Sequence, residues 1–562
     1  MKKVSVRYRD LRGVFLYMAR IVFISLYDEF APGVRTLVAT LKRAGHFSSL
    51  ICFKSYSQTP LEEVGELYEG MHIEVLPTGD HINSYSYPAS PREDQILIDL
   101  LSQLKPDLVG ISLTYSQQVA AARISSMIRE KLGLPVMWGG PHPTTGPEKC
   151  IQHADYVCRG EAEDVILDVA ERIDKNESYT DVPNIWAKKA DGEIIKNTER
   201  LQREDLDSLP FPDYDKESTF FIDQDELRCG EPFPWSDLNT NYIVMTARGC
   251  PFACTYCYQS YLKTLYPGQK FVRERSIDNV MEELKQAKER MGHFYLEILD
   301  NVFTLKESRV RKFCEKYHRE VDEPFWCYTH PKCCRENVIR PLSESPNFEY
   351  IIMGIESAST NIGKNIFHRQ QTPQDILDAA RVLNKYDIRV NYDLITNVPG
   401  ETEDDCRQNL DLLRKLPKPF RIRLSKLSLF PNYEVQEETR GHSRLVTEKR
   451  YRVWNALYFL AQDMDMTDEE VESVLNSPFF EENPEFLEKI AALFDSRWED
   501  LTTLKIKNKL KSVEIESRKK EEERLKSRYD RMMGRRGIRQ FLWLHDKAGK
   551  IKRAVKKEST AL

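Results

Sequence analysis

The sequence predicts an α/β protein made of two successive strand–helix domains and a helical C-terminal region. Short apolar runs of strand length alternate with stretches of helical period, and this alternation starts afresh near residue 239. A chain of 562 residues is also too long for one hydrophobic core and should divide into several domains. We expect an N-terminal extension over 1–18, a first domain over 19–180, a connector over 181–235, a second domain over 236–430 and a helical, charged region over 431–562.

The first domain is predicted to be a doubly wound, Rossmann-like parallel sheet. Apolar runs of strand length occupy residues 21–24, 50–53, 108–111 and 136–138, with helical stretches between them. Such sheets bind ligands beyond the carboxyl ends of their strands. No G-x-G-x-x-G motif follows the first run, which disfavours a dinucleotide as the ligand.

The second domain is predicted to be a partial (β/α)6 barrel. Six strand-like runs occur near Tyr242 and at 294–299, 325–328, 350–353, 389–395 and 421–427. Barrels of this kind hold their active sites at the carboxyl ends of the strands. The polar residues expected there are Glu297, Asp300, Asn301, Glu356, Ser357, Asn397 and Glu401.

A loop with three cysteines, Cys250, Cys254 and Cys257, follows the first strand of the predicted barrel. Thiolates at this spacing can hold three irons of a four-iron four-sulfur (4Fe–4S) cluster and leave the fourth iron open. A structural zinc ion or a disulfide is the alternative. Zinc needs a fourth ligand close by, and none of the usual paired spacings is present.

This loop resembles that of the radical S-adenosylmethionine (SAM) superfamily, in which the open iron binds SAM and an electron cleaves SAM to a 5'-deoxyadenosyl radical. Arg248 and Gly249 precede the loop, and Tyr256 stands before its last cysteine. The family often has glycine at the position of Asn397, and Arg369 matches an arginine common in the family, with a solvated surface residue as the alternative. The SAM contacts that the resemblance implies are Tyr256, Asp300, Asn301, Glu356, Ser357 and Asn397.

Three motifs of the first domain resemble the cobalamin-binding domain of cobalamin-dependent radical SAM enzymes. They are Lys-Pro-Asp-Leu-Val-Gly-Ile-Ser over 105–112, Trp-Gly-Gly-Pro-His-Pro over 138–143 and Arg-Gly-Glu-Ala-Glu-Asp over 159–164. Phe30 stands where cobalamin mutases carry the histidine that binds cobalt, so the lower face of cobalamin should lack a histidine from this loop. A domain that has lost its cofactor and only packs is the alternative. The implied cobalamin contacts are Asp28, Phe30, Gly33, Ser112, Thr114, Gly139, Gly140 and His142.

The resemblance implies a cobalamin-dependent radical SAM C-methyltransferase that acts on an unactivated carbon. No catalytic side chain is assigned, because the cofactors carry the radical chemistry. A cyclase, rearrangement or oxidation enzyme without methyl transfer, and a non-catalytic cobalamin and cluster sensor, remain alternatives. A methylthiotransferase is disfavoured, since neither a further N-terminal cysteine triad nor a C-terminal RNA-binding module is evident. The substrate, whether a small molecule, a lipid or a peptide, stays open.

Composition restricts the setting of this chemistry. Charged residues make up 30% of the chain, the net charge is -6, and no apolar run reaches membrane-spanning length, so we expect a cytoplasmic protein without a nucleic-acid partner. The resemblance implies an external electron donor of the flavodoxin or ferredoxin type. The basic stretch 531–557 could contact a membrane surface, although a plain basic tail is the simpler interpretation. Whether translation starts at Met1 or Met18 is not decided by the sequence.

A second metal site is also conceivable near the third barrel strand, where a histidine and three cysteines lie close in sequence. Adjacent cysteines rarely chelate one metal well, so we expect these residues to be ordinary packing residues. They are Cys327, His330, Cys333 and Cys334.

Overall fold

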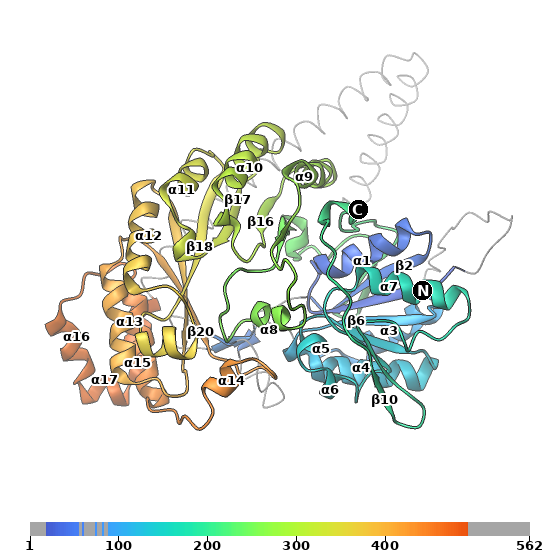
Figure 1. The fold of residues 1–562 in the computed structure, drawn as a ribbon. Coiled ribbons are helices and arrows are strands. Elements are labelled where there is room, and N and C mark those ends of the chain that lie inside the picture. Colours follow the sequence, from blue (N-terminus) through green and yellow to red (C-terminus); the bar gives the residue numbers. More distant parts are fainter. Residues whose placement is uncertain (1–17, 56–58, 61–72, 76–80, 84–87, 493–562) are drawn as a thin grey trace, which may run out of the picture. The chain divides into compact units, whose positions relative to one another are not determined.

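The computed structural model describes residues 18–55, 59–60, 73–75, 81–83 and 88–492. These residues form two large sheets with helices packed against them (Figure 1). The first sheet belongs to the predicted N-terminal domain and the second to the predicted barrel, which confirms the predicted fold class.

Five parallel strands form the centre of the first sheet, in the order β2, β1, β6, β7, β8. Because β6 lies on the opposite side of β1 from β2, the strand order reverses at β1, and ligands bind at such a switch point. The strands are β1 (Arg20–Leu26), β2 (Phe47–Phe53), β6 (Leu108–Ser112), β7 (Val136–Gly139) and β8 (Tyr156–Cys158).

Helices cover both faces of this sheet, as a parallel sheet requires. Alternate residues of β1 enter opposite cores: Ile21 packs with α1 and α7, whereas Val22 packs with α3 and α4. The helices are α1 (Pro32–Arg43), α3 (Pro91–Leu104), α4 (Gln118–Leu132) and α7 (Glu163–Asp174).

Strands from the predicted connector extend the first sheet at both edges. The β9–β10 hairpin adds antiparallel to β8, and β11 adds parallel to β2 and pairs with β12. The edge strands β2 and β8 thereby gain backbone hydrogen-bond partners that they would otherwise lack. The added strands are β9 (Ile185–Lys188), β10 (Ile194–Lys196), β11 (Thr219–Asp223) and β12 (Glu226–Cys229).

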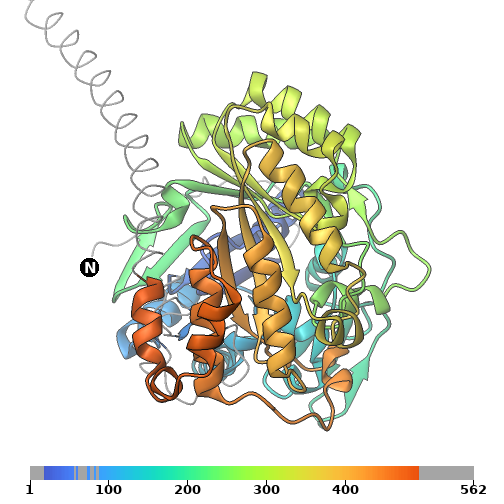
Figure 2. The ribbon, with the colours of Figure 1, turned by 90° about the vertical axis from the view of Figure 1, so that its left-hand side faces the viewer.

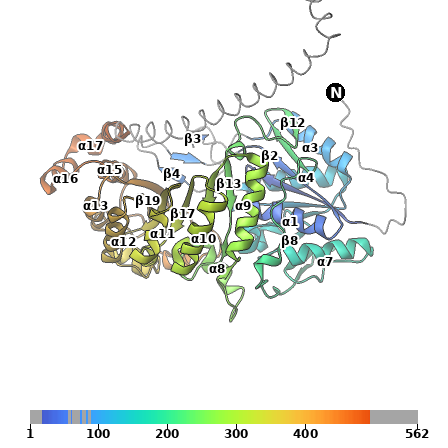
Figure 3. The same cartoon turned by 90° about the horizontal axis from the view of Figure 1, so that it is seen from above.

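Six parallel strands in chain order form the partial barrel that the sequence predicts. Its helices lie along one side of the strands (Figures 2 and 3). The strands are β13 (Asn241–Val244), β16 (Tyr295–Ile298), β17 (Phe325–Thr329), β18 (Phe348–Glu356), β19 (Arg389–Thr396) and β20 (Arg421–Lys426). The helices are α9 (Ile277–Met291), α10 (Glu307–Glu320), α11 (Glu336–Ser343), α12 (Pro373–Lys385) and α13 (Glu403–Lys415).

A segment that lies between β2 and α3 in the chain joins the second sheet. Strand β4 (Ile73–Val75) pairs antiparallel with β20, β5 (His81–Asn83) pairs with β4, and β3 (Thr59–Pro60) pairs with β5. The sequence did not predict these strands, because two or three residues are too few to show a strand period. A segment of the first domain therefore forms one edge of the second sheet.

Helices follow the last barrel strand. One of them, α15, is largely buried and packs against α13 and β20. No helix in the described ranges is long and apolar enough to cross a membrane. The predicted extension up to residue 17 and the basic stretch 531–557 lie outside the described residues. The helices are α14 (Val435–Glu438), α15 (Glu448–Leu460), α16 (Asp468–Leu475) and α17 (Pro478–Glu482).

Trp138 on β7 is tied to α4, and a glycine turn follows the strand. Its indole is fully buried and donates a 2.8 Å hydrogen bond from Nε1 to Ser125 Oγ on α4. Gly140 has a φ of 98°, and a Cβ there would lie 3.0 Å from the Leu113 carbonyl oxygen, so the turn requires glycine.

Ser125→Ala should lower the free energy of unfolding by about 1–3 kcal/mol, because it leaves the buried indole N–H without an acceptor. Urea denaturation followed by circular dichroism measures this change. In the background Trp138→Phe the same substitution should cost clearly less, since no N–H then needs a partner. Equal costs in the two backgrounds would contradict the role of this hydrogen bond.

Candidate active site between the two sheets

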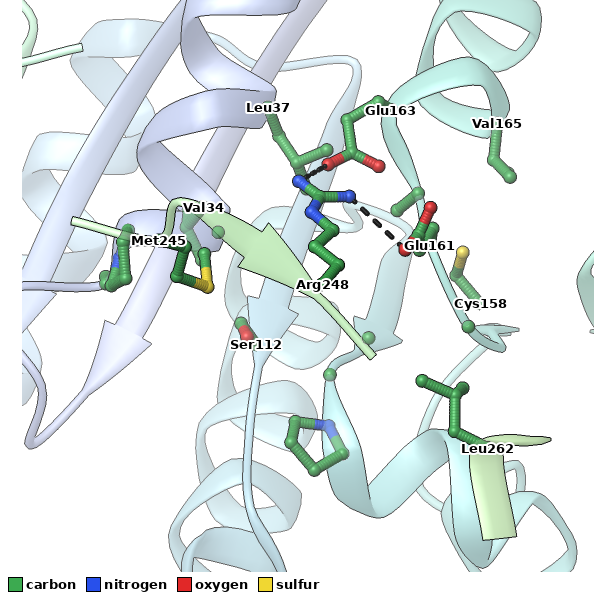
Figure 4. A pocket seen from close by; sticks show the side chains of 18 of the residues that line it. Val34, Leu37, Ser112, Cys158, Glu161, Glu163, Val165, Met245, Arg248 and Leu262 are labelled. Atoms are coloured by element: carbon green, nitrogen blue, oxygen red, sulfur yellow. Dashed lines mark hydrogen bonds and ion pairs between the residues drawn. The ribbon is translucent and has the colours of Figure 1, made fainter. Parts of the chain in front are cut away.

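A cavity of about 530 Å³ lies between the carboxyl ends of the first sheet and the start of the barrel (Figure 4). Its wall is mainly apolar, with a few polar groups, as is usual for a cofactor site. From the first domain the wall includes Asp28, Gly33, Val34, Ser112, Gly139, Gly140 and Glu163, and from the barrel Met245, Arg248, Gly249, Leu299 and Asn301.

Five of the eight predicted cobalamin contacts line this cavity. Gly33 and Gly139 are open to it, since no heavy atom lies within 4 Å of where a Cβ would stand. Thr114 and His142 instead line a smaller neighbouring cavity, and Phe30 lines neither. The five that line the large cavity are Asp28, Gly33, Ser112, Gly139 and Gly140.

The loop after β1 is held by its own side chains. Asp28 Oδ1 accepts 3.0 Å hydrogen bonds from the N–H groups of Phe30 and Ala31. The buried Arg35 donates 2.8 Å bonds to the carbonyls of Phe30 and Glu29. Burial raises the pKa of Asp28. The cavity is mainly apolar, lies at the switch point and is bordered by glycines without neighbouring atoms. These features fit a large flat cofactor such as cobalamin. The loop after β1 has no histidine that could bind its cobalt.

The cysteine loop runs between β14 (Ala247–Arg248) and α8 (Tyr258–Thr264). Gly249 has a φ of 89°, and a Cβ there would lie 2.2 Å from the Phe271 carbonyl oxygen, so only glycine fits before Cys250. Burial raises the pKa of Cys250, and that of Cys257 to about 12. Thiolates in this buried loop therefore need a positive group beside them, which the irons of a cluster would be.

The geometry of the loop does not suit a single zinc ion. The three cysteines are free thiols, and their sulfurs do not all lie within 4.8 Å of one another. Three sulfurs on one zinc would stand about 3.8 Å apart, given Zn–S bonds of about 2.3 Å. In a 4Fe–4S cluster each thiolate binds a different iron, so wider spacing is expected. The arrangement fits the cluster predicted from the sequence.

A buried polar network lies beside Cys254. Arg369 Nη1 is 3.7 Å from Cys254 Sγ and donates a 2.8 Å hydrogen bond to Tyr256 Oη. Arg369 Nη2 donates a 2.5 Å bond to the Gly354 carbonyl. Glu356 ends β18 with a left-handed φ of 63°, and its Oε1 is 3.8 Å from Arg369. The solvated-surface interpretation of Arg369 is wrong, since the residue is only 7% exposed.

Glu356 is the titratable group of this network. Burial raises its pKa to about 7, although the Arg369 guanidinium opposes the shift. A carboxyl group poised near neutrality can accept a hydrogen bond from an amine or a hydroxyl of a bound ligand. The structure thus brings Tyr256 and Glu356, two predicted SAM contacts, together beside the cluster loop.

Asp300 and Asn301 follow β16 and differ in their surroundings. The buried Asp300 carboxylate accepts hydrogen bonds from the N–H groups of Thr246, at 2.6 Å, and Ala247, at 2.9 Å. It therefore shapes the strand that leads into the cysteine loop. Asn301 lines the large cavity, and its Nδ2 is 3.5 Å from the Gly249 carbonyl oxygen. Of the two, Asn301 is the one placed to touch a ligand.

Ser357 and Asn397 lie after the fourth and fifth barrel strands. Ser357 Oγ donates a 3.2 Å hydrogen bond to Asn409 Oδ1 and so supports its own turn. Asn397 has a φ of 60°, a conformation that favours glycine and that asparagine tolerates. Asparagine can therefore stand at a position where the resemblance leads one to expect glycine. Asn397 Oδ1 is buried without a partner among the described residues.

Glu401 ties the loop after β19 to the C-terminal helices. Its Oε2 accepts hydrogen bonds from Val398 N–H, at 3.2 Å, and from Tyr451 Oη on α15, at 2.7 Å. The side chain is almost completely buried, which raises its pKa to about 7. Glu297, the remaining predicted carboxylate, accepts a 3.0 Å bond from Tyr328 Oη on the neighbouring strand.

An ion cluster that sequence reasoning missed joins the two domains. Arg248, the residue before Gly249, extends between two glutamates of the first domain (Figure 4). Its Nη2 is 2.6 Å from Glu163 Oε1, and its Nη1 is 3.4 Å from Glu161 Oε1. Arg273 on β15 (Arg273–Glu274) binds Glu161 with both terminal nitrogens, at 2.9 and 2.5 Å. Both glutamates belong to the 159–164 motif. Glu163 and Arg248 are 85 residues apart in the chain, so the sequence does not indicate that they pair.

Gly160 completes the junction between these domains. It has a φ of 74°, and a Cβ there would lie 1.9 Å from the Tyr266 hydroxyl oxygen. Attraction between opposite charges stabilises the ion cluster despite its burial. Desolvation alone would raise the pKa of Glu163, but the Arg248 guanidinium holds this pKa below its usual value. The loop that carries the cysteines therefore starts from a point anchored on the first domain.

The residues near the third barrel strand show no metal-ligand geometry. His330 stacks on Phe252 with ring centroids 3.7 Å apart, and burial lowers its pKa to about 2. Cys334 Sγ packs 3.8 Å from Met353 Sδ. In the described ranges, the one trio of such groups with ligand atoms mutually within 4.8 Å is His368, Glu434 and Glu438.

Two family models match the chain, in the order in which the two domains occur. The B12 binding domain matches residues 21–170, and the radical SAM superfamily matches residues 244–413. The matched segments are those that line the large cavity from its two sides. The chain belongs to the cobalamin-binding radical SAM enzymes. The matches confirm the predicted cofactors, which are cobalamin for the first domain and SAM with an iron–sulfur cluster for the barrel.

Similar proteins include enzymes of two activities. An uncharacterized methyltransferase of Pyrococcus horikoshii is 26% identical over 392 residues, which cover 68% of this chain and 79% of the relative. An anaerobic magnesium-protoporphyrin IX monomethyl ester cyclase of Rubrivivax gelatinosus is 22% identical over 363 residues, which cover 62% of this chain and 60% of the cyclase.

Two solved structures share the fold. The radical SAM methyltransferase TsrM from Kitasatospora setae, with cobalamin and a 4Fe–4S cluster bound, has a TM-score of 0.53 and 16% identity over 74% of this chain and 77% of TsrM. The cobalamin-dependent radical enzyme OxsB, with aqua-cobalamin bound, has a TM-score of 0.53 and 16% identity over 76% of this chain and 56% of OxsB. The individual contact residues of the present chain stay predictions.

Arg248→Met should lower the free energy of unfolding by about 3 kcal/mol, because it leaves the buried Glu163 without its ion-pair partner, whereas Glu161 keeps Arg273. Arg172→Met removes an arginine whose ion pairs with Glu177 and Asp181 are exposed and should cost at most about 1 kcal/mol. Urea denaturation of both variants under the same conditions measures the difference. Equal stability of Arg248→Met and the wild type would contradict the anchoring role of Arg248.

Glu401→Gln should remove a pH dependence of stability. Because burial raises the pKa of Glu401 from 4.5 to about 7, the folded state holds this proton more tightly than the unfolded state. Its stabilising contribution, about 3 kcal/mol, is complete below pH 4.5 and is lost as the pH rises through 7. Melting temperatures of wild type and variant between pH 5 and 8 test this: the variant should lose less stability over that range.

Proposed function

We propose that the protein is a C-methyltransferase that transfers a methyl group to an unactivated carbon. One observation supports this most strongly: residues of the first domain and residues beside the cysteine loop line the same cavity. Asp28 and Gly139 stand on one side of it, and Gly249 and Asn301 on the other. A methyl carrier and a source of radicals held at these two walls would face each other across one space.

When bound, the cluster and SAM supply a radical that abstracts hydrogen, and cobalamin supplies the methyl group. Cys250, Cys254 and Cys257 would hold the cluster. Arg369 contacts Cys254 and Tyr256 and provides a positive charge beside the cluster, and Glu356 would accept a hydrogen bond from SAM. The mainly apolar cavity wall would keep water away from reactive groups.

The loop after β1 suits a cofactor that exchanges methyl groups. Asp28 and Arg35 hold its backbone, and Phe30 offers no ligand atom for cobalt. The lower face would then lack a histidine from this loop. Cobalamin held by this loop without a histidine ligand would supply the methyl group.

Cyclisation without methyl transfer is the second candidate function. It is favoured by the 22% identity to the magnesium-protoporphyrin cyclase over 62% of this chain. The same residues would serve either reaction, so the products of SAM distinguish them. A flavodoxin or ferredoxin as electron donor and a location in the cytoplasm stay predictions from the sequence.

Quantification of 5'-deoxyadenosine and S-adenosylhomocysteine tests the proposal. After anaerobic reconstitution with iron, sulfide and cobalamin, the enzyme is incubated with SAM and a reductant, and both products are measured by mass spectrometry. We expect both to form, and S-adenosylhomocysteine to disappear when cobalamin is omitted. Deoxyadenosine alone would favour the cyclase.

Cys254→Ala should abolish deoxyadenosine formation, because the cluster loses one of its three thiolate ligands. Cys229→Ala is the matched control, since Cys229 is an exposed thiol on β12, outside the loop. Iron content and visible absorbance measure cluster retention in both variants. An intact cluster in Cys254→Ala would contradict the assignment of this ligand.

A further inference from the structure

A second cavity, of about 210 Å³, adjoins the large one, and Pro141 lines both. We call it the aromatic cavity. The loops after β6 and β7 form one of its walls, and the segment after β20 forms the other. It is lined by Thr114, Tyr115, Ser116, Pro141, His142, Thr145, Phe430 and Tyr433.

The position of the aromatic cavity is that of a substrate site. Its walls follow the carboxyl ends of strands in both sheets, where parallel sheets and barrels bind their ligands. Asn432 Nδ2 donates a 2.6 Å hydrogen bond to the Thr145 carbonyl and so holds the two walls together. A group in this cavity would lie next to the space assigned to the cofactors.

Three aromatic rings and an imidazole shape the cavity. Tyr115 meets His142 edge to face, with ring centroids 4.8 Å apart, and meets Phe430 at 5.7 Å. Phe430 lies 5.3 Å from Tyr433. Aromatic walls in these arrangements favour a planar, conjugated ring as the bound group.

The aromatic cavity is also uncharged. None of its eight lining residues is an aspartate, glutamate, lysine or arginine. His142 is only 2% exposed, and burial lowers its pKa to about 4, so it is neutral at pH 7. A charged ligand would lose its hydration without gaining an opposite charge.

A few polar atoms can orient a neutral ring. The hydroxyl oxygens of Thr114 and Ser116 lie 3.1 Å apart. A hydroxyl oxygen can accept a hydrogen bond, and His142 is held beside them by its Nε2, which is 2.8 Å from Gln118 Oε1. A ring that carries an N–H or O–H donor suits this set.

We propose that the aromatic cavity binds a neutral, planar ring of the substrate, one or two fused rings in size and carrying a hydrogen-bond donor. This rests on the proposed function, since it assumes that a substrate meets the two cofactors here. A volume of about 210 Å³ admits such a group but not a whole tetrapyrrole macrocycle.

Indole serves as the probe. Indole-3-carboxylate, which has the same ring and a negative charge, serves as the charged control ligand. Binding of each to the enzyme loaded with cobalamin and cluster is measured by isothermal titration calorimetry. We expect indole to bind and the carboxylate to bind at least about tenfold more weakly. Equal binding of the two would overturn the conclusion that the cavity selects a neutral ring. Failure of indole to bind would overturn the proposal as a whole.

Variants locate the probe. Phe430→Leu and Tyr115→Leu should each weaken indole binding about tenfold, whereas Phe479→Leu, at a half-exposed ring on α17, should not change it. Leucine keeps much of the side-chain volume, and retention of cobalamin together with the circular dichroism spectrum checks that each variant is folded. Unchanged binding in both cavity variants would overturn the assignment.

The cofactor itself could be the occupant of the aromatic cavity. Indole that binds only the cobalamin-free enzyme would show this and overturn the proposal. The formation of S-adenosylhomocysteine in the absence of indole tests the methyltransferase independently. If that product fails to form while indole binds as expected, the proposed function is wrong and the ring site stands.

Discussion

The ion cluster between Arg248 and the glutamates after β8 is the constraint on which the site depends. Arg248 directly precedes the glycine that leads into the cysteine loop, so its pairing with Glu161 and Glu163 sets where that loop begins relative to the first sheet. Gly160 allows the same junction to close, because its missing side chain leaves room for the Tyr266 hydroxyl. The cavity that would hold two cofactors exists because these contacts bring the ends of two sheets together.

Burial governs the chemistry within that arrangement. The low polarity around Cys257, Glu356 and Glu401 favours their uncharged forms and raises the pKa of each. Arg369 supplies the opposing charge beside the cysteine loop, since it contacts Cys254 and Tyr256 while it is itself buried. Burial therefore favours the uncharged forms of these side chains, and Arg369 provides a buried positive charge beside Cys254.

The two cavities differ in what they can accept. The larger one follows the switch point of the first sheet and reaches Gly249 and Tyr258, which flank the cysteine loop, whereas the aromatic cavity lies at the β20 side and has no charged lining residue. Pro141 lines both, so the start of α5 (Pro141–Thr145) lies between the larger cavity and the aromatic cavity. This division follows from the packing of two domains and belongs to neither domain alone.

The sequence by itself determined the α/β fold and predicted the three cluster ligands, because strand periods and a three-cysteine spacing are local signals. It also identified Gly33 and Gly139, whose open backbone the structure shows at the cavity. Only the tertiary structure decided which distant residues meet: the pairing of Arg248 with Glu163, the burial of Arg369, the hydrogen bonds of Asp300 to Thr246 and Ala247, and the short strands that extend the sheets. These features depend on contacts between segments that are distant in the chain, and such contacts produce no periodic pattern in the sequence.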